Sequence, residues 1–148
     1  MTDDQPNDNS PADQFTRGLD LLKAGDYWEA HEAWEDLWHT LPKDCAARRA
    51  TKALIQLAAI CYKPEQAASG RCETAMQRGM GKLIETAQTH LRDSGDLPGP
   101  TPGFDDHALA DALARLEAIH NDWCHGEELH EIRCRIQQAA LCFTTAEH

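Results

Sequence analysis

The sequence contains no valine in 148 residues, whereas alanine occurs 22 times and leucine 15 times. β-Branched residues favour strands, and alanine and leucine are among the strongest helix formers. The composition therefore predicts an all-α fold. The length and a hydrophobic content of 41% suffice for one globular domain with its own core.

Basic residues are also scarce, with 14 lysines and arginines against 25 acidic residues and a net charge of -11. Such a surface repels the phosphates of nucleic acids, so we expect no nucleic-acid partner. No apolar run approaches the roughly 20 residues that span a bilayer, and the first residues hold neither a basic nor an apolar signal segment. We therefore expect a cytoplasmic protein without a membrane partner.

No C-x-x-C pair occurs among the six cysteines. Without an export signal, we expect them to be reduced and to act as small core residues. They are Cys45, Cys61, Cys72, Cys124, Cys134 and Cys142.

Hydrophobic periodicity and turn residues divide the chain into four parts. Residues 1–12 are polar and are expected to form a disordered acidic tail. Residues 13–92 are expected to form a four-helix core, and residues 93–104, with three prolines and three glycines, a loop. Residues 105–148 are expected to add helices that pack on the core, giving a single-domain antiparallel helical bundle. The expected helices are 13–24, 27–41, 44–62, which ends before Pro64, 69–92, 105–119 and 127–142.

The second expected helix holds three of the four tryptophans. Successive helical residues lie about 100° apart, and the apolar residues then share one arc that we expect to face the core. His31 falls at the edge of this arc beside Trp38, Glu35 lies just outside it, and Glu32 points toward water. The residues of the arc are Tyr27, Ala30, Trp34, Leu37, Trp38 and Leu41.

His31 and Glu35 are one helical turn apart, so they can hydrogen-bond, bind one metal ion, or act as a base and its orienting partner. The structural interpretation of His31 is a partly buried imidazole hydrogen-bonded to Glu35 or to a backbone carbonyl. The string H-E-A-W-E is not a zinc-protease motif, because Glu35 stands where that motif requires a second histidine. A divalent metal ion on His31 and Glu35 needs a further ligand from another helix.

The third expected helix carries Arg48, Arg49, Lys52 and Lys63 opposite the acidic residues of the second. We expect these opposite charges to dock the two helices. Periodicity places Gln56 in the same basic sector, at the surface or at the seam between the helices.

A known family also matches this region. The segments F-T-R-G-L-D-L-L-K-A-G-D-Y-W-E-A-H-E-A-W-E-D-L-W and A-L-I-Q-L-A-A-I resemble the bacterial family called domain of unknown function 309. The resemblance covers about Phe15 to Leu91 and implies a compact helical bundle without an established activity. It places the family-typical polar residues at His31, Glu32, Glu35 and Gln56 and the typical aromatic at Trp38. Ala53 departs from the family, which usually has glycine there.

A second cluster of metal-ligand residue types lies late in the chain. One continuous helix would place its members on one side, but a single helix cannot surround a tetrahedral ion, and Gly126 is a helix breaker. We therefore expect core cysteines and solvated histidines here. The cluster comprises His120, Cys124, Glu127, Glu131 and Cys134, with His125 and His130 nearby.

Two functions remain open. The first is a small-ligand site around His31, Glu32, Glu35 and Gln56, with or without a divalent metal ion, in which Trp38 limits water access. The alternative is a non-catalytic interaction or homodimerising module, because L-L-K-A-G-D-Y-W-E-A also resembles one helical hairpin of a tetratricopeptide repeat. Whether any reaction is catalysed stays open. A pocket shared by His31, Glu35 and Gln56 favours the first function.

Overall fold

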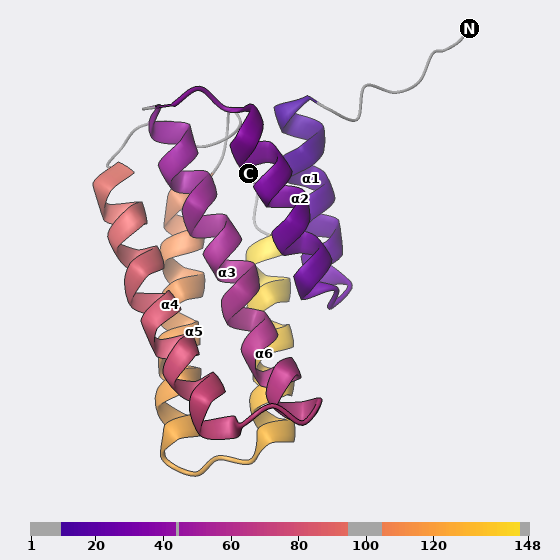
Figure 1. Ribbon diagram of the computed structural model, residues 1–148, viewed down its shortest axis with the longest axis vertical. Helices are drawn as coiled ribbons and strands as arrows, with labels where there is room; N and C mark the ends of the chain where they lie inside the picture. The colour runs from indigo at the N-terminus through magenta and orange to yellow at the C-terminus, as the bar shows by residue number, and fades with distance from the viewer. Residues whose placement is uncertain (1–9, 44, 95–104, 146–148) are drawn as a thin grey trace, which may run out of the picture.

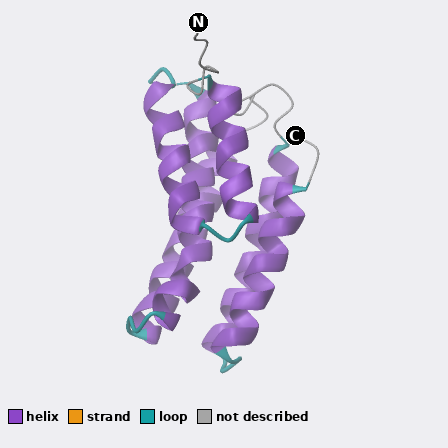
Figure 2. Cartoon of the chain, turned by 90° about the vertical axis from the view of Figure 1, so that its right-hand side faces the viewer, coloured by secondary structure: helices purple, strands orange, loops and turns teal. Residues whose placement is uncertain are grey.

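The computed structural model of the chain describes residues 10–43, 45–94 and 105–145. Over these residues the protein consists of six α-helices without a strand, which confirms the all-α prediction. The helices run roughly along the long axis of the molecule (Figures 1 and 2), and none of the described ones is both long and apolar enough to cross a bilayer. They are α1 (Pro11–Lys23), α2 (Tyr27–Thr40), α3 (Ala46–Ala68), α4 (Glu73–Ser94), α5 (Asp106–Cys124) and α6 (Leu129–Thr144).

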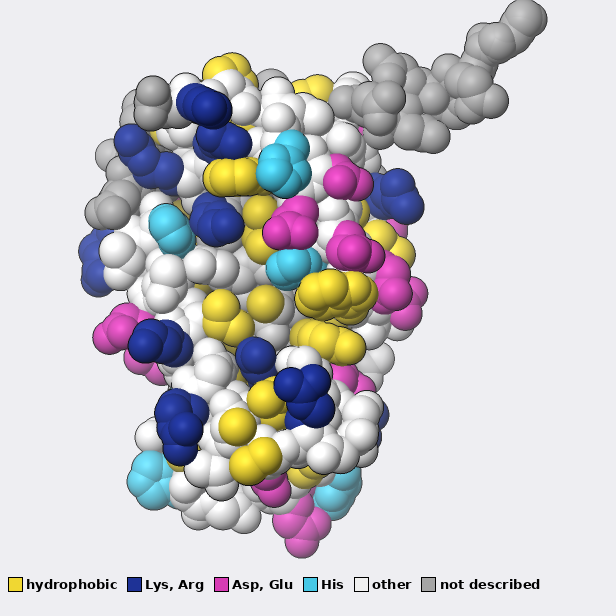
Figure 3. Space-filling model, viewed as in Figure 1, with side chains coloured by type: hydrophobic (Ala, Val, Ile, Leu, Met, Phe, Trp, Pro, Cys, Tyr) yellow, Lys and Arg dark blue, Asp and Glu magenta, His cyan; other side chains and the backbone are white. Residues whose placement is uncertain are grey.

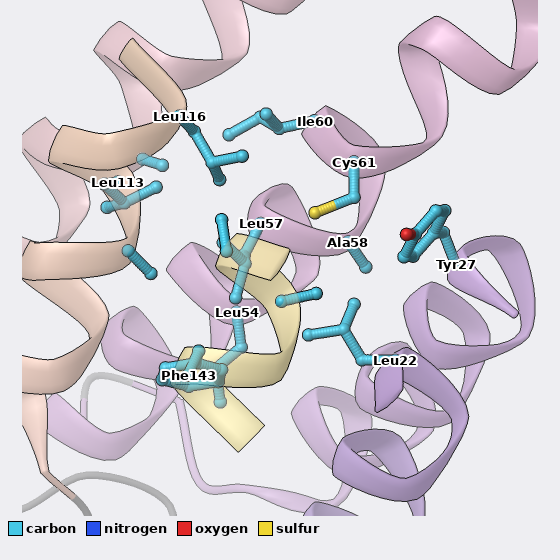
Figure 4. Close-up of a cluster of buried hydrophobic side chains, with 14 of the residues drawn as sticks. Leu22, Tyr27, Leu54, Leu57, Ala58, Ile60, Cys61, Leu113, Leu116 and Phe143 are labelled. Atoms are coloured by element: carbon cyan, nitrogen blue, oxygen red, sulfur yellow. The ribbon is translucent and has the colours of Figure 1, made fainter. Parts of the chain in front are cut away.

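Helix α3 is the central element of the bundle. It packs against α2 and α4, and it also contacts α5 and α6 (Figure 1). Figure 4 shows Leu54, Leu57 and Ile60 of α3 between two groups of side chains, one from the α1–α2 hairpin and one from α5 and α6. These residues belong to one hydrophobic core that receives side chains from all six helices.

The first helix begins earlier than the sequence predicts. Ser10 is its N-cap, with the hydroxyl accepting a hydrogen bond from the Asp13 N–H at 3.1 Å, and Pro11 occupies the first turn. A proline is well tolerated there, because the first helical N–H groups have no partner within the helix. The predicted tail is therefore wrong for residues 10–12, and its residues 1–9 lie outside the described part of the chain.

Of the predicted loop 93–104, residues 93 and 94 belong to α4, and the remaining ten lie outside the described residues.

Helix α3 does not end before Pro64, as predicted, but continues through it to Ala68. A proline inside a helix removes one backbone hydrogen bond and costs about 3 kcal/mol. Contacts of the added turns offset this cost. Pro64 is buried, and Glu65 forms a bidentate ion pair with Arg133 of α6, with distances of 2.8 and 2.9 Å.

The last two helices are separate. Helix α5 runs to Cys124, five residues further than predicted. Gly126 then has a φ of 106°, and the chain turns there before α6 begins. A φ in this range suits glycine, since it has no Cβ.

The predicted core role of the cysteines holds for Cys61 and is wrong for Cys72, Cys124, Cys134 and Cys142. These four side chains are exposed to solvent, and none of the six cysteines forms a disulfide.

One tight contact packs α2 against α1 in the helical hairpin. Trp34 of α2 is fully buried, and its indole Nε1 donates a hydrogen bond to the Phe15 carbonyl of α1 at 3.2 Å. The indole lies directly on Gly18, where a Cβ would come within 2.0 Å of Nε1. Because a ring cannot be compressed, residue 18 has no room for a side chain.

This contact predicts opposite effects of one substitution at two helical glycines. Gly18→Ala should lower the free energy of unfolding by about 3 kcal/mol or more, because Trp34 must leave its position. Gly79→Ala should raise it by up to about 1 kcal/mol, because alanine is the better helix former and its Cβ would meet only the flexible Lys63 side chain, at 3.3 Å. Urea unfolding followed by circular dichroism measures both. A Gly18→Ala protein as stable as the wild type would contradict this description of the hairpin.

Candidate functional site

The burial of Trp34 sets which side chains of α2 face α3. At about 100° per residue, Trp38 lies about 40° and His31 about 60° from Trp34, on the same side. Trp38 contacts Arg48 and Lys52 near the start of α3, and Trp28 contacts Tyr62 near its end. The two helices are therefore antiparallel, and their shared seam carries the candidate residues of the sequence analysis.

The predicted core arc of α2 is confirmed for Tyr27, Ala30, Trp34 and Leu37, each at most 4% exposed. The prediction is too broad at Trp38 and Leu41, which are only partly buried. Both lie near the C-terminal end of the helix. Trp38 consequently presents part of its ring to the surface beside α3.

His31 is held by stacking rather than by a hydrogen bond. Its ring lies against the Trp28 indole, with centroids 4.7 Å apart and planes inclined by 10°. Its Nδ1 atom is buried without a hydrogen-bond partner among the described residues, and it lies 3.9 Å from Glu35 Oε1, too far for a hydrogen bond. The predicted hydrogen bond of His31 to Glu35 or to a carbonyl is therefore wrong for Nδ1.

Burial lowers the pKa of His31 below its usual value. Loss of solvent around the imidazole is the main cause, and nearby Lys52 lowers the pKa further, while Glu35 and Glu32 raise it in part. The neutral ring is therefore the favoured form at neutral pH. A neutral imidazole retains one nitrogen that can accept a proton or a hydrogen bond.

Gln56 is 9% exposed, and its Oε1 atom is buried without a hydrogen-bond partner in the described part of the chain. It lies on α3 between Lys52, which contacts Trp38, and Tyr62, which contacts Trp28. The antiparallel register therefore places Gln56 level with residues 31–35 of α2. Of the two positions that periodicity left open, the seam is the one it occupies.

Glu32 and Glu35 lie toward solvent. Glu32 is exposed, and the Glu35 side chain is 45% exposed. No ion pair joins a carboxylate of α2 to a cation of α3 within the described residues, so the expected docking by opposite charges is wrong. The Arg48 guanidinium carbon instead lies 3.8 Å from the centroid of the Trp38 ring, and Lys52 Nζ lies 4.9 Å from it. Both distances are typical of cation–π contacts.

An open pocket lies where Trp38 meets α3. Its volume is about 230 Å³, and its wall combines one aromatic ring with several basic side chains. Figure 3 shows basic side chains gathered toward the N-terminal end of α3, acidic ones over α2, and hydrophobic atoms exposed between them. The wall consists of Trp38, Cys45, Arg48, Arg49, Lys52 and His90.

Of the predicted site residues, only Trp38 lines this pocket. His31 and Gln56 lie further along the seam, and Glu32 and Glu35 lie on its solvent side. Sequence reasoning assigned Arg48, Arg49 and Lys52 to helix docking and missed their role as pocket wall. The signal was present, since three of the 14 basic residues of this acidic chain fall within five consecutive positions.

The described residues contain no group of three or more His, Cys, Asp or Glu side chains arranged to hold a metal ion. His31 and Glu35 therefore remain a pair without a third ligand of these types. In the late cluster, the helix break places His120 and Cys124 on α5, Glu131 and Cys134 on α6, and Glu127 in the connection between them. His120 Nε2 lies 2.7 Å from the Gln77 carbonyl and 3.5 Å from Cys124 Sγ, so this histidine ties α5 to α4.

The fold and the pocket describe a small helical bundle with an open surface pocket lined by residues of α2, α3 and α4 and by Cys45. Comparison with known proteins finds one similarity: residues 15–74 match the model of DUF309, a domain of unknown function. The match confirms the resemblance seen in the sequence over this segment. It is shorter than the resemblance, which extended to Leu91, but it contains α2 and α3 entire. No curated protein and no solved structure matches the chain.

The lowered pKa of His31 predicts a pH dependence of stability. The unfolded chain binds a proton at His31 more readily than the folded chain, so this histidine costs stability as the pH falls below about 6.5. His31→Phe keeps a ring against Trp28 but cannot be protonated. Urea unfolding at pH 7 and pH 5 should therefore show a larger loss of unfolding free energy in the wild type than in His31→Phe. Equal losses would refute this assignment of the imidazole.

Proposed function

We propose that this protein binds a small molecule on the α2–α3 face, with the Trp38 pocket as the binding site. The observation that carries the proposal is the pocket itself, which places one aromatic ring and several polar side chains around an open volume of about 230 Å³. Binding sites for small molecules combine apolar walls with a few convergent polar groups. The volume is below the roughly 300–1,000 Å³ typical of drug-sized ligands, which suits a small metabolite.

The seam beside the pocket supports the same proposal. His31 Nδ1 and Gln56 Oε1 are both buried without a hydrogen-bond partner among the described residues, and each such atom costs about 1–3 kcal/mol. Groups retained at this cost are candidates for a role other than stability. We assign them polar contacts to the ligand or to water at the inner end of the site, with Glu35 and Glu32 at its solvent edge.

A homodimerising module is less well supported. Among the described residues, the one exposed large hydrophobic side chain is Trp28, which is 44% exposed. A specific interface buries about 800 Å² on each partner around a core of several apolar side chains. One exposed indole, already stacked on His31, offers much less than that.

Thermal unfolding with a panel of small molecules tests the proposal. The panel should contain neutral sugars, amines, carboxylates and phosphates, so that no ligand class is assumed. A binder at about 100 times its Kd stabilises the folded state by about 2.7 kcal/mol, which for a chain of this size raises Tm by about 5–10 °C.

Two tryptophan variants localise the effect. Trp38→Leu removes the aromatic wall and should abolish the ligand-induced rise in Tm, whereas Trp28→Leu, at the other end of α2, should preserve it. A panel in which no compound raises Tm would overturn the proposal. A rise that survives Trp38→Leu and is lost in Trp28→Leu would do the same.

A further inference from the structure

The Trp38 pocket is basic although the protein is strongly acidic. Arg48, Arg49 and Lys52 contribute three positive charges to its wall, and none of the described residues of the wall is an aspartate or glutamate. The whole chain, in contrast, carries a net charge of -11. In a concave site, charges of one sign reinforce one another and attract ligands of the opposite sign.

These cations lack the carboxylate partners that other arginines in this protein have. Arg133 pairs with Glu65, and Arg135 pairs with Asp122 and Glu127. In the part of the chain that the structure describes, no carboxylate lies within ion-pair distance of Arg48, Arg49 or Lys52. Their charge is therefore available to a ligand.

The Trp38 ring orders two of the three cations. Arg48 stacks on the ring and donates a hydrogen bond from Nε to the Trp38 carbonyl at 3.3 Å, while Lys52 Nζ lies near the same ring. Neither Nη group of Arg48 has a hydrogen-bond partner among the described residues. A guanidinium fixed in this way is pre-organised to bind two oxygens of one anion, because less rotamer entropy is lost on binding.

A neighbouring pocket provides an internal contrast. It lies between α4 and α5 and contains Arg78 and Lys82, but also Glu85 and Glu117. Its charges are therefore balanced within its own wall. The Trp38 pocket therefore differs from a surface on which positive and negative side chains alternate.

We propose that the Trp38 pocket binds a small oxyanion with two or more negative charges, such as a phosphate ester or a polycarboxylate. The inference rests on the proposed function and adds the ligand class. Arg48 holds the anion through its paired N–H groups, and Arg49 and Lys52 neutralise the remaining charge. The exposed edge of Trp38 contacts the organic part of the ligand.

Isothermal titration calorimetry with pyrophosphate and with citrate tests this ligand class. We expect at least one of the two to bind the wild-type protein at a single saturable site. Binding of pyrophosphate alone identifies the phosphate group, binding of citrate alone identifies the carboxylate group, and binding of both shows that the pocket selects charge. Failure of both anions to bind would overturn the inference.

The double variant Arg49→Gln, Lys52→Gln locates the site. Arg49 is exposed, and Lys52 is only partly buried, beside the Trp38 ring, so the fold should be retained, as circular dichroism can verify. We expect Kd to rise about tenfold or more in this variant, and to change by less than about twofold in Lys82→Gln, the matched control. Unchanged affinity in the double variant would refute the inference.

The inference and the proposed function fail separately. If a neutral or cationic compound raises Tm through Trp38 while both anions fail, the pocket binds small molecules and the assigned ligand class is wrong. If no compound of the panel and neither anion binds, both are wrong.

Discussion

Trp34 packs directly on the backbone of Gly18, and this contact determines how α2 is rotated about its own axis. The indole is fully buried and hydrogen-bonded to α1, so α2 cannot turn without losing both interactions. With Trp34 fixed, His31 and Trp38 must lie on the flank that faces α3. The arrangement of the candidate site therefore follows from a contact on the neighbouring side of the same helix.

Helix α3 connects the core to the surface site. One side of it supplies Leu54, Leu57 and Ile60 to the centre of the bundle (Figure 4). The flank toward α2 carries Lys52, which stands over Trp38, and Gln56 in the seam. Since the same rigid helix contributes to both, its core packing also positions the basic wall of the pocket. Sites on rigid elements hold their geometry better than sites on loops.

Much of the fold follows from the sequence. The absence of valine and the apolar periodicity predict six helices, and the structure has six in its described residues. The main errors concern boundaries. Pro64 should end α3 by local preference, but its burial and the Glu65–Arg133 ion pair outweigh that preference, and neither can be read from the segment alone.

The candidate site was only partly predictable. Periodicity and the family resemblance together lead to His31, Gln56 and Trp38, because helical spacing determines which residues share a flank. They cannot show that Arg48 stacks on Trp38 rather than pairing with an acidic side chain of α2. Helix docking by opposite charges was the simpler expectation. Whether Arg48 stacks on Trp38 or pairs with an acidic side chain depends on the register between the two helices. That register is a tertiary property.

Chemical-shift mapping on ¹⁵N-labelled protein tests most directly whether the Trp38 pocket is the ligand site. Pyrophosphate is the probe, because it carries the charge and oxygen donors that the wall should select. The largest changes should occur at the indole N–H of Trp38 and at the backbone amides of residues 45–52. Changes concentrated at residues 78–88 and 117–120, around the charge-balanced pocket, or no changes at saturating pyrophosphate, would contradict the account.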